Sequence, residues 1–217
     1  MNETLDLAIK NGHVAALRAK LRHWKTCHKD VMNDAALCDD ERFGKMSVLN
    51  YALLNARNTK MMVKMLADEG ARLDFTNVAT MTFAAPEVVP FLKQMGADAN
   101  KSFDRFYETA STGTSATIKT TPLCYAAYNA DYKKIEALID AGAYTKDAFA
   151  KQAVIECIEA DHTTDKEKIF ALNTLQQKGV DILNVCRHPK VEMTEQVATF
   201  YSNELEMAVF KNMQNQR

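Results

Sequence analysis

Cysteine and histidine side chains, which bind soft metal ions such as zinc, occur in two groups along the chain. They are His23, Cys27, His28 and Cys38 in the first group, and Cys157, His162, Cys186 and His188 in the second. A zinc site needs four convergent donors, usually as two closely spaced pairs. The first group has a His-x3-Cys-His-x9-Cys spacing that matches no common zinc finger, and the second has two loose pairs. We therefore expect ordinary helix residues here and no metal or other cofactor, and we keep a metal-binding protein as an alternative.

Residues for enzymatic catalysis are not arranged as a recognisable site. A thiol enzyme needs a cysteine that is activated by a nearby base, but Cys124 and Cys157 fall at helix positions that face a core. The acidic runs at 39–41 and 204–206 are typical of a solvated face rather than of an acid–base pair. The sequence also has no phosphate-binding glycine loop and no nucleophile elbow. We predict that the protein is not an enzyme.

Basic residues are concentrated near the amino terminus, where the segment 7–29 contains no acid. They are Lys10, Arg18, Lys20, Arg22, Lys25 and Lys29, accompanied by His23, Trp24 and His28. Such a patch can hold an acidic protein surface, a phosphate group or a nucleic-acid backbone. Nucleic-acid binding also calls for aromatic side chains that stack on bases, and beyond Trp24 the segment has none. We expect a solvated helix face here and no nucleic acid as a partner.

The elements that would position these side chains are clearest in the stretch 121–143, TPLCYAAYNADYKKIEALIDAGA. Thr121 can cap a helix whose first residue is Pro122, where the missing N–H is harmless. The run breaks before Tyr132, where a second helix begins, and Gly142 supplies the left-handed residue that ends it. The pattern predicts two short antiparallel helices. One such pair cannot bury its own apolar faces, so it needs similar pairs stacked beside it.

This stretch resembles an ankyrin repeat, whose pattern is Thr-Pro-Leu-His-x-Ala-Ala, a turn, and a second helix that ends Leu-Leu-x-x-Gly-Ala. The sequence departs from it at Cys124, where histidine is usual, which affects the hydrogen bonds of the turn rather than the fold. The resemblance implies an all-α fold, an ankyrin-repeat solenoid of about five helix-turn-helix repeats with a C-terminal capping helix.

Degenerate copies of the pattern extend along most of the chain. The approximate units are 3–22, 47–74, 80–100, 121–144 and 147–184, which form an array over 1–184, with insertions at 23–46 and 101–120 and a helical cap at 185–217. Gly70, Gly96, Gly142 and Gly179 close four of the units. Pro86 shortens the first helix of the third unit. An array also needs a terminal element with one polar side, which the cap provides.

The two insertions have different character. We expect an extra helical turn or two within 23–46. In 101–120 the second half is mostly Ser, Thr, Gly and Ala, a composition that does not stay ordered by itself. Its first half carries Phe103, Arg105, Phe106 and Tyr107. These residues either contact a partner at the repeat tips or, for the two phenylalanines, fold back over the shortened repeat.

Composition excludes several classes of protein. The chain has 217 residues, a net charge of −1 and five scattered cysteines without the spacing of a disulfide framework. It has no apolar run of the roughly 20 residues that span a membrane, and no signal-like segment follows Met1. We expect a cytoplasmic protein with free thiols and without a membrane span.

The family resemblance implies a non-enzymatic scaffold that binds another protein through its concave face and inter-repeat tips, and no small-molecule ligand is expected. The expected partner-binding residues are Asn50, Tyr51, Asn55, Phe103, Arg105, Tyr107, Tyr125, Tyr128 and Asn129. An alternative is a bacterial secreted effector, delivered to a host cytosol, or a toxin-neutralising protein built on the same repeats. The small size, the degenerate units and a C-terminal stretch at 194–206 that suits a secretion signal favour that alternative.

Overall fold

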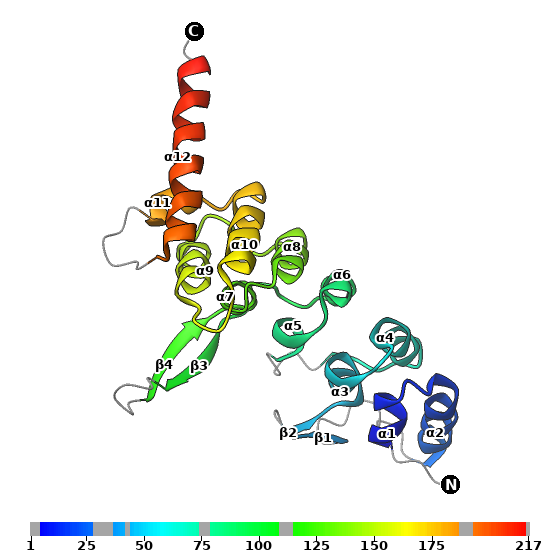
Figure 1. Ribbon diagram of the computed structural model, residues 1–217. Coiled ribbons are helices and arrows are strands. Elements are labelled where there is room, and N and C mark those ends of the chain that lie inside the picture. Colours follow the sequence, from blue (N-terminus) through cyan, green and yellow to red (C-terminus); the bar gives the residue numbers. More distant parts are fainter. Residues whose placement is uncertain are drawn as a thin grey trace. The chain divides into compact units, whose positions relative to one another are not determined.

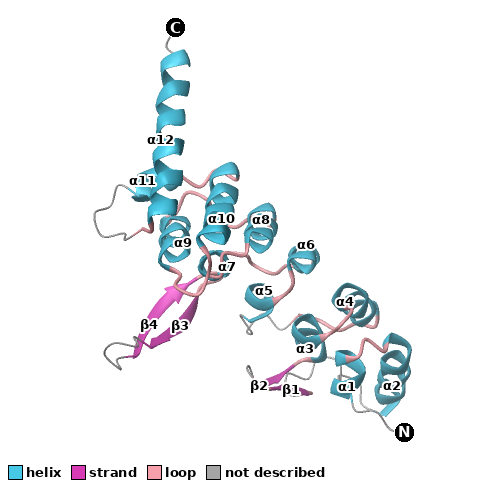
Figure 2. Ribbon diagram, in the orientation of Figure 1, coloured by secondary structure: helices cyan, strands magenta, loops and turns pink. Residues whose placement is uncertain are grey.

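The computed structural model describes residues 5–27, 37–41, 44–73, 79–108, 115–186 and 193–215. In these ranges the protein is mostly helical, with twelve α-helices and two small two-stranded sheets (Figures 1 and 2). The chain divides into two compact units, Met1–Asp98 and Ala99–Arg217. None of the described helices combines the length and the apolar character needed to cross a membrane.

Unit 1 contains a hairpin and short helices. Its elements are α1 (Leu5–Lys10), α2 (Val14–Cys27), β1 (Cys38–Asp40), β2 (Gly44–Met46), α3 (Val48–Asn55), α4 (Thr59–Asp68), α5 (Ala79–Phe83), the 3-10 helix η2 (Pro86–Val88) and α6 (Val89–Gln94). Helix α1 packs against α2 and α3, α2 packs against α4, and α3 packs against α4, α5 and β1. The core of this unit comes from residues that are fully buried, including Leu17, Leu49, Met62 and Leu66.

Unit 2 repeats the order of a hairpin followed by helices. Its elements are β3 (Phe103–Glu108), β4 (Ser115–Thr120), α7 (Pro122–Tyr128), α8 (Tyr132–Asp140), α9 (Ala148–Glu159), α10 (Asp165–Gln177), α11 (Ile182–Cys186) and α12 (Glu195–Asn215). Helix α7 packs against α8 and α9, and α10 packs against α8, α9, α11 and α12. The C-terminal helices therefore belong to this unit, and the outer half of α12 extends beyond the other helices of the unit in Figure 1.

The expected helix signals of the stretch 121–143 are confirmed. The Thr121 hydroxyl accepts a hydrogen bond from the backbone N–H of Cys124, and Pro122 is the first residue of α7. Helix α8 begins at Tyr132. Pro86 and Pro90 lie in the first turns of η2 and α6, where their missing N–H groups leave no helical bond unmade.

Four helices end in the same way, at the glycines that the sequence marks as closing residues. Gly70, Gly96, Gly142 and Gly179 have φ values of 91°, 90°, 99° and 91°. At each closure the glycine N–H bonds to the carbonyl three residues before it, and the next N–H reaches five residues back, as in the Ala143 to Leu138 bond of 2.9 Å. This is the Schellman motif, which needs a left-handed residue that glycine supplies without strain. The recurrence is local, and no repeat or solenoid is detected over the described residues.

The expectation of an all-α fold needs correction because both insertions contain a β-hairpin. Strand β1 pairs antiparallel with β2, and β3 pairs with β4 from Phe103–Thr120 to Glu108–Ser115. The segment 115–120, expected to be unordered, is rich in β-branched residues that favour a strand once a partner lies beside it. In the first insertion, α2 continues through Trp24 to Cys27, and the residues 28–36 expected to add helical turns lie outside the described part.

Candidate functional site

The hairpin β3–β4 leads directly into helix α7, so its residues are held beside that helix. Strand β4 ends at Thr120 and the cap residue Thr121 follows. In the pairing register Arg105 lies opposite Ile118, and directly opposed residues project from the same face of a sheet. The Ile118 side chain remains 39% exposed, whereas that of Arg105 is 16% exposed. Arg105 and Ile118 therefore share one face of the hairpin, and Arg105 is the one that the helices cover.

Arg105 packs on two tyrosines of α7. The Arg105 guanidinium carbon lies 3.7 Å from the centre of the Tyr128 ring and 5.2 Å from that of Tyr125. The two tyrosines are three residues apart, so one helix face presents both rings. A guanidinium over an aromatic face is attracted by the ring's quadrupole, and the attraction grows when water is excluded.

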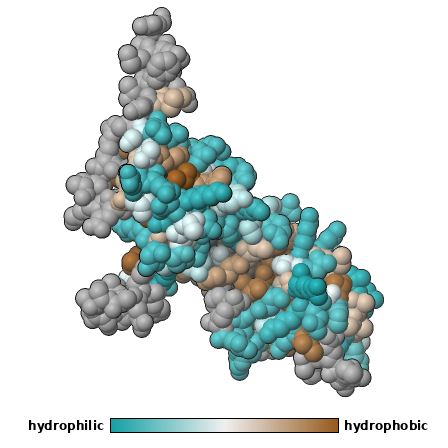
Figure 3. Space-filling view, viewed as in Figure 1, coloured by the Kyte–Doolittle hydropathy of each residue, from teal (hydrophilic) through white to brown (hydrophobic). Residues whose placement is uncertain are grey.

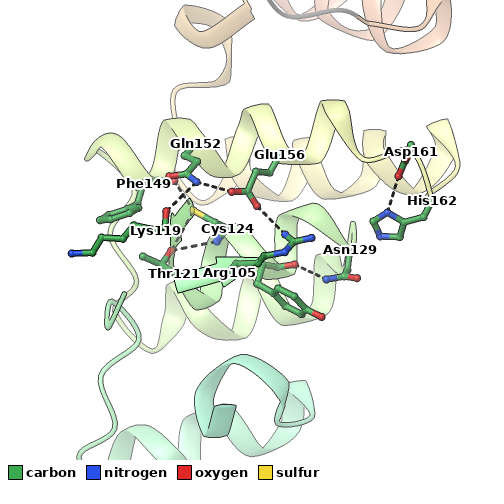
Figure 4. Close-up of polar contacts among 11 residues, drawn as sticks. Arg105, Lys119, Thr121, Cys124, Asn129, Phe149, Gln152, Glu156, Asp161 and His162 are labelled. Atoms are coloured by element: carbon green, nitrogen blue, oxygen red, sulfur yellow. Dashed lines mark hydrogen bonds and ion pairs between the residues drawn. The ribbon is translucent and has the colours of Figure 1, made fainter. Parts of the chain in front are cut away.

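A carboxylate on α9 completes the charge pairing of this cluster (Figure 4). Glu156 Oε2 lies 3.5 Å from Arg105 Nη1, and the Glu156 side chain is only 10% exposed. Gln152 Nε2 donates to Glu156 Oε1 at 2.7 Å and to the Lys119 carbonyl of β4 at 3.3 Å. Both strands of the hairpin are thus linked to α9, β3 through Arg105 and β4 through the Lys119 carbonyl. We call Arg105, Tyr125, Tyr128, Gln152 and Glu156 the hairpin anchor.

Burial raises the pKa of Glu156, and this effect outweighs the opposing effects of the Gln152 hydrogen bond and the Arg105 charge. A buried carboxylate of this kind needs a cation as its partner, because an ionised group without a partner is strongly disfavoured away from water. The single carboxylate is already occupied by Arg105 and Gln152. The arrangement suits positioning of the hairpin rather than proton transfer to a substrate.

Cys124, near the start of α7, makes its own polar contacts. The Thr121 hydroxyl donates to Cys124 Sγ at 3.3 Å, and the thiol donates to the Phe149 carbonyl at 3.2 Å (Figure 4). The second bond joins α7 to α9. Burial raises the pKa of Cys124 to about 11 and that of Cys157 to about 12. The expectation that these two thiols face a core is confirmed by their full burial.

The edge of the hairpin anchor reaches solvent at the end of α7. Tyr128 is half-buried, and its ring centre lies 4.4 Å from that of the exposed His162. Asn129 is exposed, and its amide donates to the Tyr125 carbonyl at 2.7 Å. Of the expected partner-binding residues whose side chains are described, five fall in unit 2. Arg105, Tyr125, Tyr128 and Asn129 lie together, and Phe103 pairs with Thr120 at the base of the hairpin. Tyr107 lies in β3, but its side chain is outside the described part of the structure.

The expected partner-binding residues of unit 1 need correction. Asn50 and Tyr51 are 0% and 1% exposed, so they belong to the core and offer no surface to a partner. They lie in α3, which packs against α1, α4, α5 and β1 and is buried from Val48 to Leu53. Asn55 is half-buried, and its amide donates to Asp40 Oδ2 at 2.7 Å and to the Tyr51 carbonyl at 3.2 Å. It therefore fixes the hairpin β1–β2 to α3.

Sequence reasoning missed Glu156 and Gln152, and it considered His162 only as a candidate metal ligand. One signal was available for the first of them, because Glu156 is an acid flanked by the apolar run Ala153, Val154, Cys157 and Ile158. An acid on a buried helix face predicts a buried cation. The sequence does not say that this cation comes from residue 105, because the pairing joins residues 51 positions apart.

The structure describes only some of the candidate metal ligands. No group of three or more candidate ligands gathers among the described residues. In the first group His28 and the Cys27 side chain lie outside the described residues, and in the second His188 and the Cys186 side chain do. Cys38, Cys124 and Cys157 are free and buried.

Comparison of the chain with known proteins gives no family. No protein-family model matches the sequence, and a search of the curated proteins finds no match.

Proposed function

We propose that the chain is a small, degenerate ankyrin-like array that binds another protein and does not catalyse a reaction. The observation that carries the proposal is the hairpin anchor, which fixes β3–β4 to α7 and α9 before any partner arrives. A surface that is ordered in advance loses little conformational entropy on binding. Tyrosine and arginine side chains are also the residues that contribute most at protein interfaces.

Support for the array comes from the correspondence between two segments of the chain. In unit 1 a hairpin is followed by the cap Ser47, the pair α3 and α4, and Gly70. In unit 2 a hairpin is followed by the cap Thr121, the pair α7 and α8, and Gly142. The amides of Asn55 and Asn129 both donate to the carbonyl of a tyrosine four residues earlier. Equivalent residues thus make equivalent bonds.

The proposed contact surface is the exposed rim of the hairpin anchor. It combines Ile118 of β4, Tyr128 and Asn129 at the end of α7, and His162. The rim offers apolar, aromatic and amide groups together, a mixture that is typical of protein interfaces. Arg105 supports the rim from below and is not itself offered to the partner.

Photo-crosslinking tests this surface without disturbing the core. A benzoylphenylalanine placed at Ile118 or at Asn129 in the full chain, expressed in its native cells, is expected to give a discrete protein adduct on irradiation. The control is the same amino acid at Lys133, an exposed position on α8. Adducts from the control alone, or from none of the three positions, would show that this rim is not the binding surface.

A further inference from the structure

Helices α2 and α4 of unit 1 together carry an excess of basic residues. Between 14–27 and 57–72 the sequence has eight basic residues and two acidic ones. The basic residues are Arg18, Lys20, Arg22, Lys25, Arg57, Lys60, Lys64 and Arg72, and the acids are Asp68 and Glu69. From the sequence alone, the basic residues of 14–27 predict a solvated helix. The basic residues of 57–72 lie about forty positions later, and only the fold brings the two groups together.

The two helices run side by side in the same direction. At their starts, a Cβ added to Gly12 would lie 3.6 Å from that of Asn58. At the other end, Arg18 and Arg22 reach Glu69, just after α4, at 3.4 and 3.3 Å. Arg18 and Arg22 of α2 thus lie against the end of α4, and Lys60 and Lys64 are one turn apart on the exposed side of α4. We call these four side chains the basic face. A ten-residue helix makes this face about 15 Å long.

The middle of the basic face is open to solvent. Lys60, Met61 and Lys64 are exposed, and Met61 is 55% exposed. Neither lysine forms an ion pair with a residue in the described ranges. In the view of Figure 3 the surface over α2 and α4 is mostly hydrophilic with small apolar areas. Within the described ranges the face thus presents two lysines without an acidic partner, beside an apolar side chain.

The corresponding helices of unit 2 have no such excess. On α8 and just after α10, Lys178 lies 3.2 Å from Glu136 and 2.8 Å from Asp140. Lys133 of α8 and Lys166 of α10 are exposed, and each of these two helices carries as many acidic as basic residues. Positive charge is therefore a property of the unit 1 helices and not of second helices in general.

We propose that the basic face is a docking surface for an acidic segment of a partner protein. The proposal rests on the protein-binding function proposed above and names the chemistry of a second contact. The Glu69 carboxylate, placed between two guanidinium groups, already makes the kind of contact that an aspartate or glutamate of the partner would make. Met61 offers an apolar contact that a peptide side chain fills. Trp24 of α2 is half-buried, and the described parts of α2 and α4 contain no phenylalanine or tyrosine for base stacking, which disfavours nucleic acid.

The test uses the full chain and a fluorescein-labelled twelve-residue peptide rich in glutamate with one central leucine. Fluorescence anisotropy is expected to show binding that weakens as salt is raised, because the contact is between exposed charges. The double substitution Lys60→Glu and Lys64→Glu is expected to weaken binding at least about tenfold. The matched control, Lys133→Glu with Lys166→Glu, is expected to bind within about twofold of the wild type. Circular dichroism confirms that both variants are folded.

Three results would overturn the proposal: no binding by the wild type, equal binding by the Lys60 and Lys64 variant, or tighter binding of a twelve-nucleotide single-stranded DNA than of the peptide. The last result would make the basic face a nucleic-acid surface. The crosslinking experiment at Asn129 does not involve Lys60 or Lys64. Absence of an adduct in that experiment would count against the proposed function and would leave the peptide-binding test of the basic face unaffected.

Discussion

The two hairpins of the chain are attached to their helices by different chemistry. In unit 1 a hydrogen bond of 2.7 Å links Asp40 of β1 to the Asn55 amide of α3. In unit 2 the guanidinium of Arg105 stacks on two tyrosines and pairs with the Glu156 carboxylate of α9. The first link stays within one helix pair, whereas the second passes beyond the pair α7 and α8 to α9.

This difference shows that one local plan, a hairpin followed by a helix pair, can be stabilised in two ways. A hydrogen bond between a carboxylate and an amide holds a short hairpin with few desolvated groups. A mostly buried ion pair loses much of its Coulomb energy to desolvation, so it contributes more to a defined orientation than to net stability. We infer that the hairpin of unit 2 is positioned for contact with a partner, while that of unit 1 is structural.

The largest effect is expected from Arg105→Ala, which leaves the Glu156 carboxylate without its cation. The free energy of unfolding should fall by about 3 kcal/mol, the usual result of breaking a largely buried pair. Urea unfolding followed by circular dichroism measures the loss, and Trp24, the only tryptophan and part of unit 1, provides a fluorescence control that should not change. Arg105→Lys should lose less. A loss below about 1 kcal/mol would mean that the anchor does not hold the hairpin.

The same substitution should have a pH-dependent effect. Because burial raises the pKa of Glu156, the protonated carboxyl favours the folded state at acidic pH, and this contribution is lost as the pH rises through the raised pKa. The ion pair with Arg105 contributes only once Glu156 is ionised, whereas the stacking of Arg105 on the tyrosines does not depend on pH in this range. The stability gap between wild type and Arg105→Ala should therefore widen from pH 4 to pH 8. In a Glu156→Gln background the gap should stay constant, and a gap that narrows with pH would exclude this coupling.

A smaller effect is expected from Asn55→Ala in unit 1. Asp40 loses one hydrogen bond in a buried position, which corresponds to about 1 kcal/mol. Urea unfolding followed by Trp24 fluorescence reports this unit. Asn129→Ala is the matched control because its amide donates to the equivalent tyrosine carbonyl, and it should lose less. Equal losses in the two variants would show that Asp40 does not need this bond.

The smallest effect is expected from Arg22→Ala, also an arginine paired with a glutamate. The Arg22 side chain is 67% exposed, and Arg18 remains 3.4 Å from Glu69. The free energy of unfolding should change by less than about 0.5 kcal/mol, as for most exposed pairs. Trp24 fluorescence in urea gives the value. A loss as large as that of Arg105→Ala would remove the distinction between the two ion pairs.

Local chemistry allowed much of the helical order to be read from the sequence. Thr121, Pro122 and Gly142 act within a few residues of themselves, so their types predict the start and end of helices wherever the chain goes. For the same reason the closing glycines at 70, 96 and 179 were predictable. The candidate site was predicted in part, since Arg105, Tyr125 and Tyr128 do lie together.

Contacts between distant segments were not predictable in this way. Neither strand of β3–β4 is stable alone, and the weak signal of 115–120 becomes a strand only beside its partner. Asn50 and Tyr51 look like surface residues by type, and only the packing around α3 buries them.

The sequence by itself determined where helices begin and end, because capping groups and left-handed glycines act over three to five residues. The tertiary structure alone decided that Glu156 receives Arg105 and that α2 and α4 share one basic face. Those outcomes depend on which segments meet in space, and pairings over long loops are set by burial and charge rather than by local conformational preference.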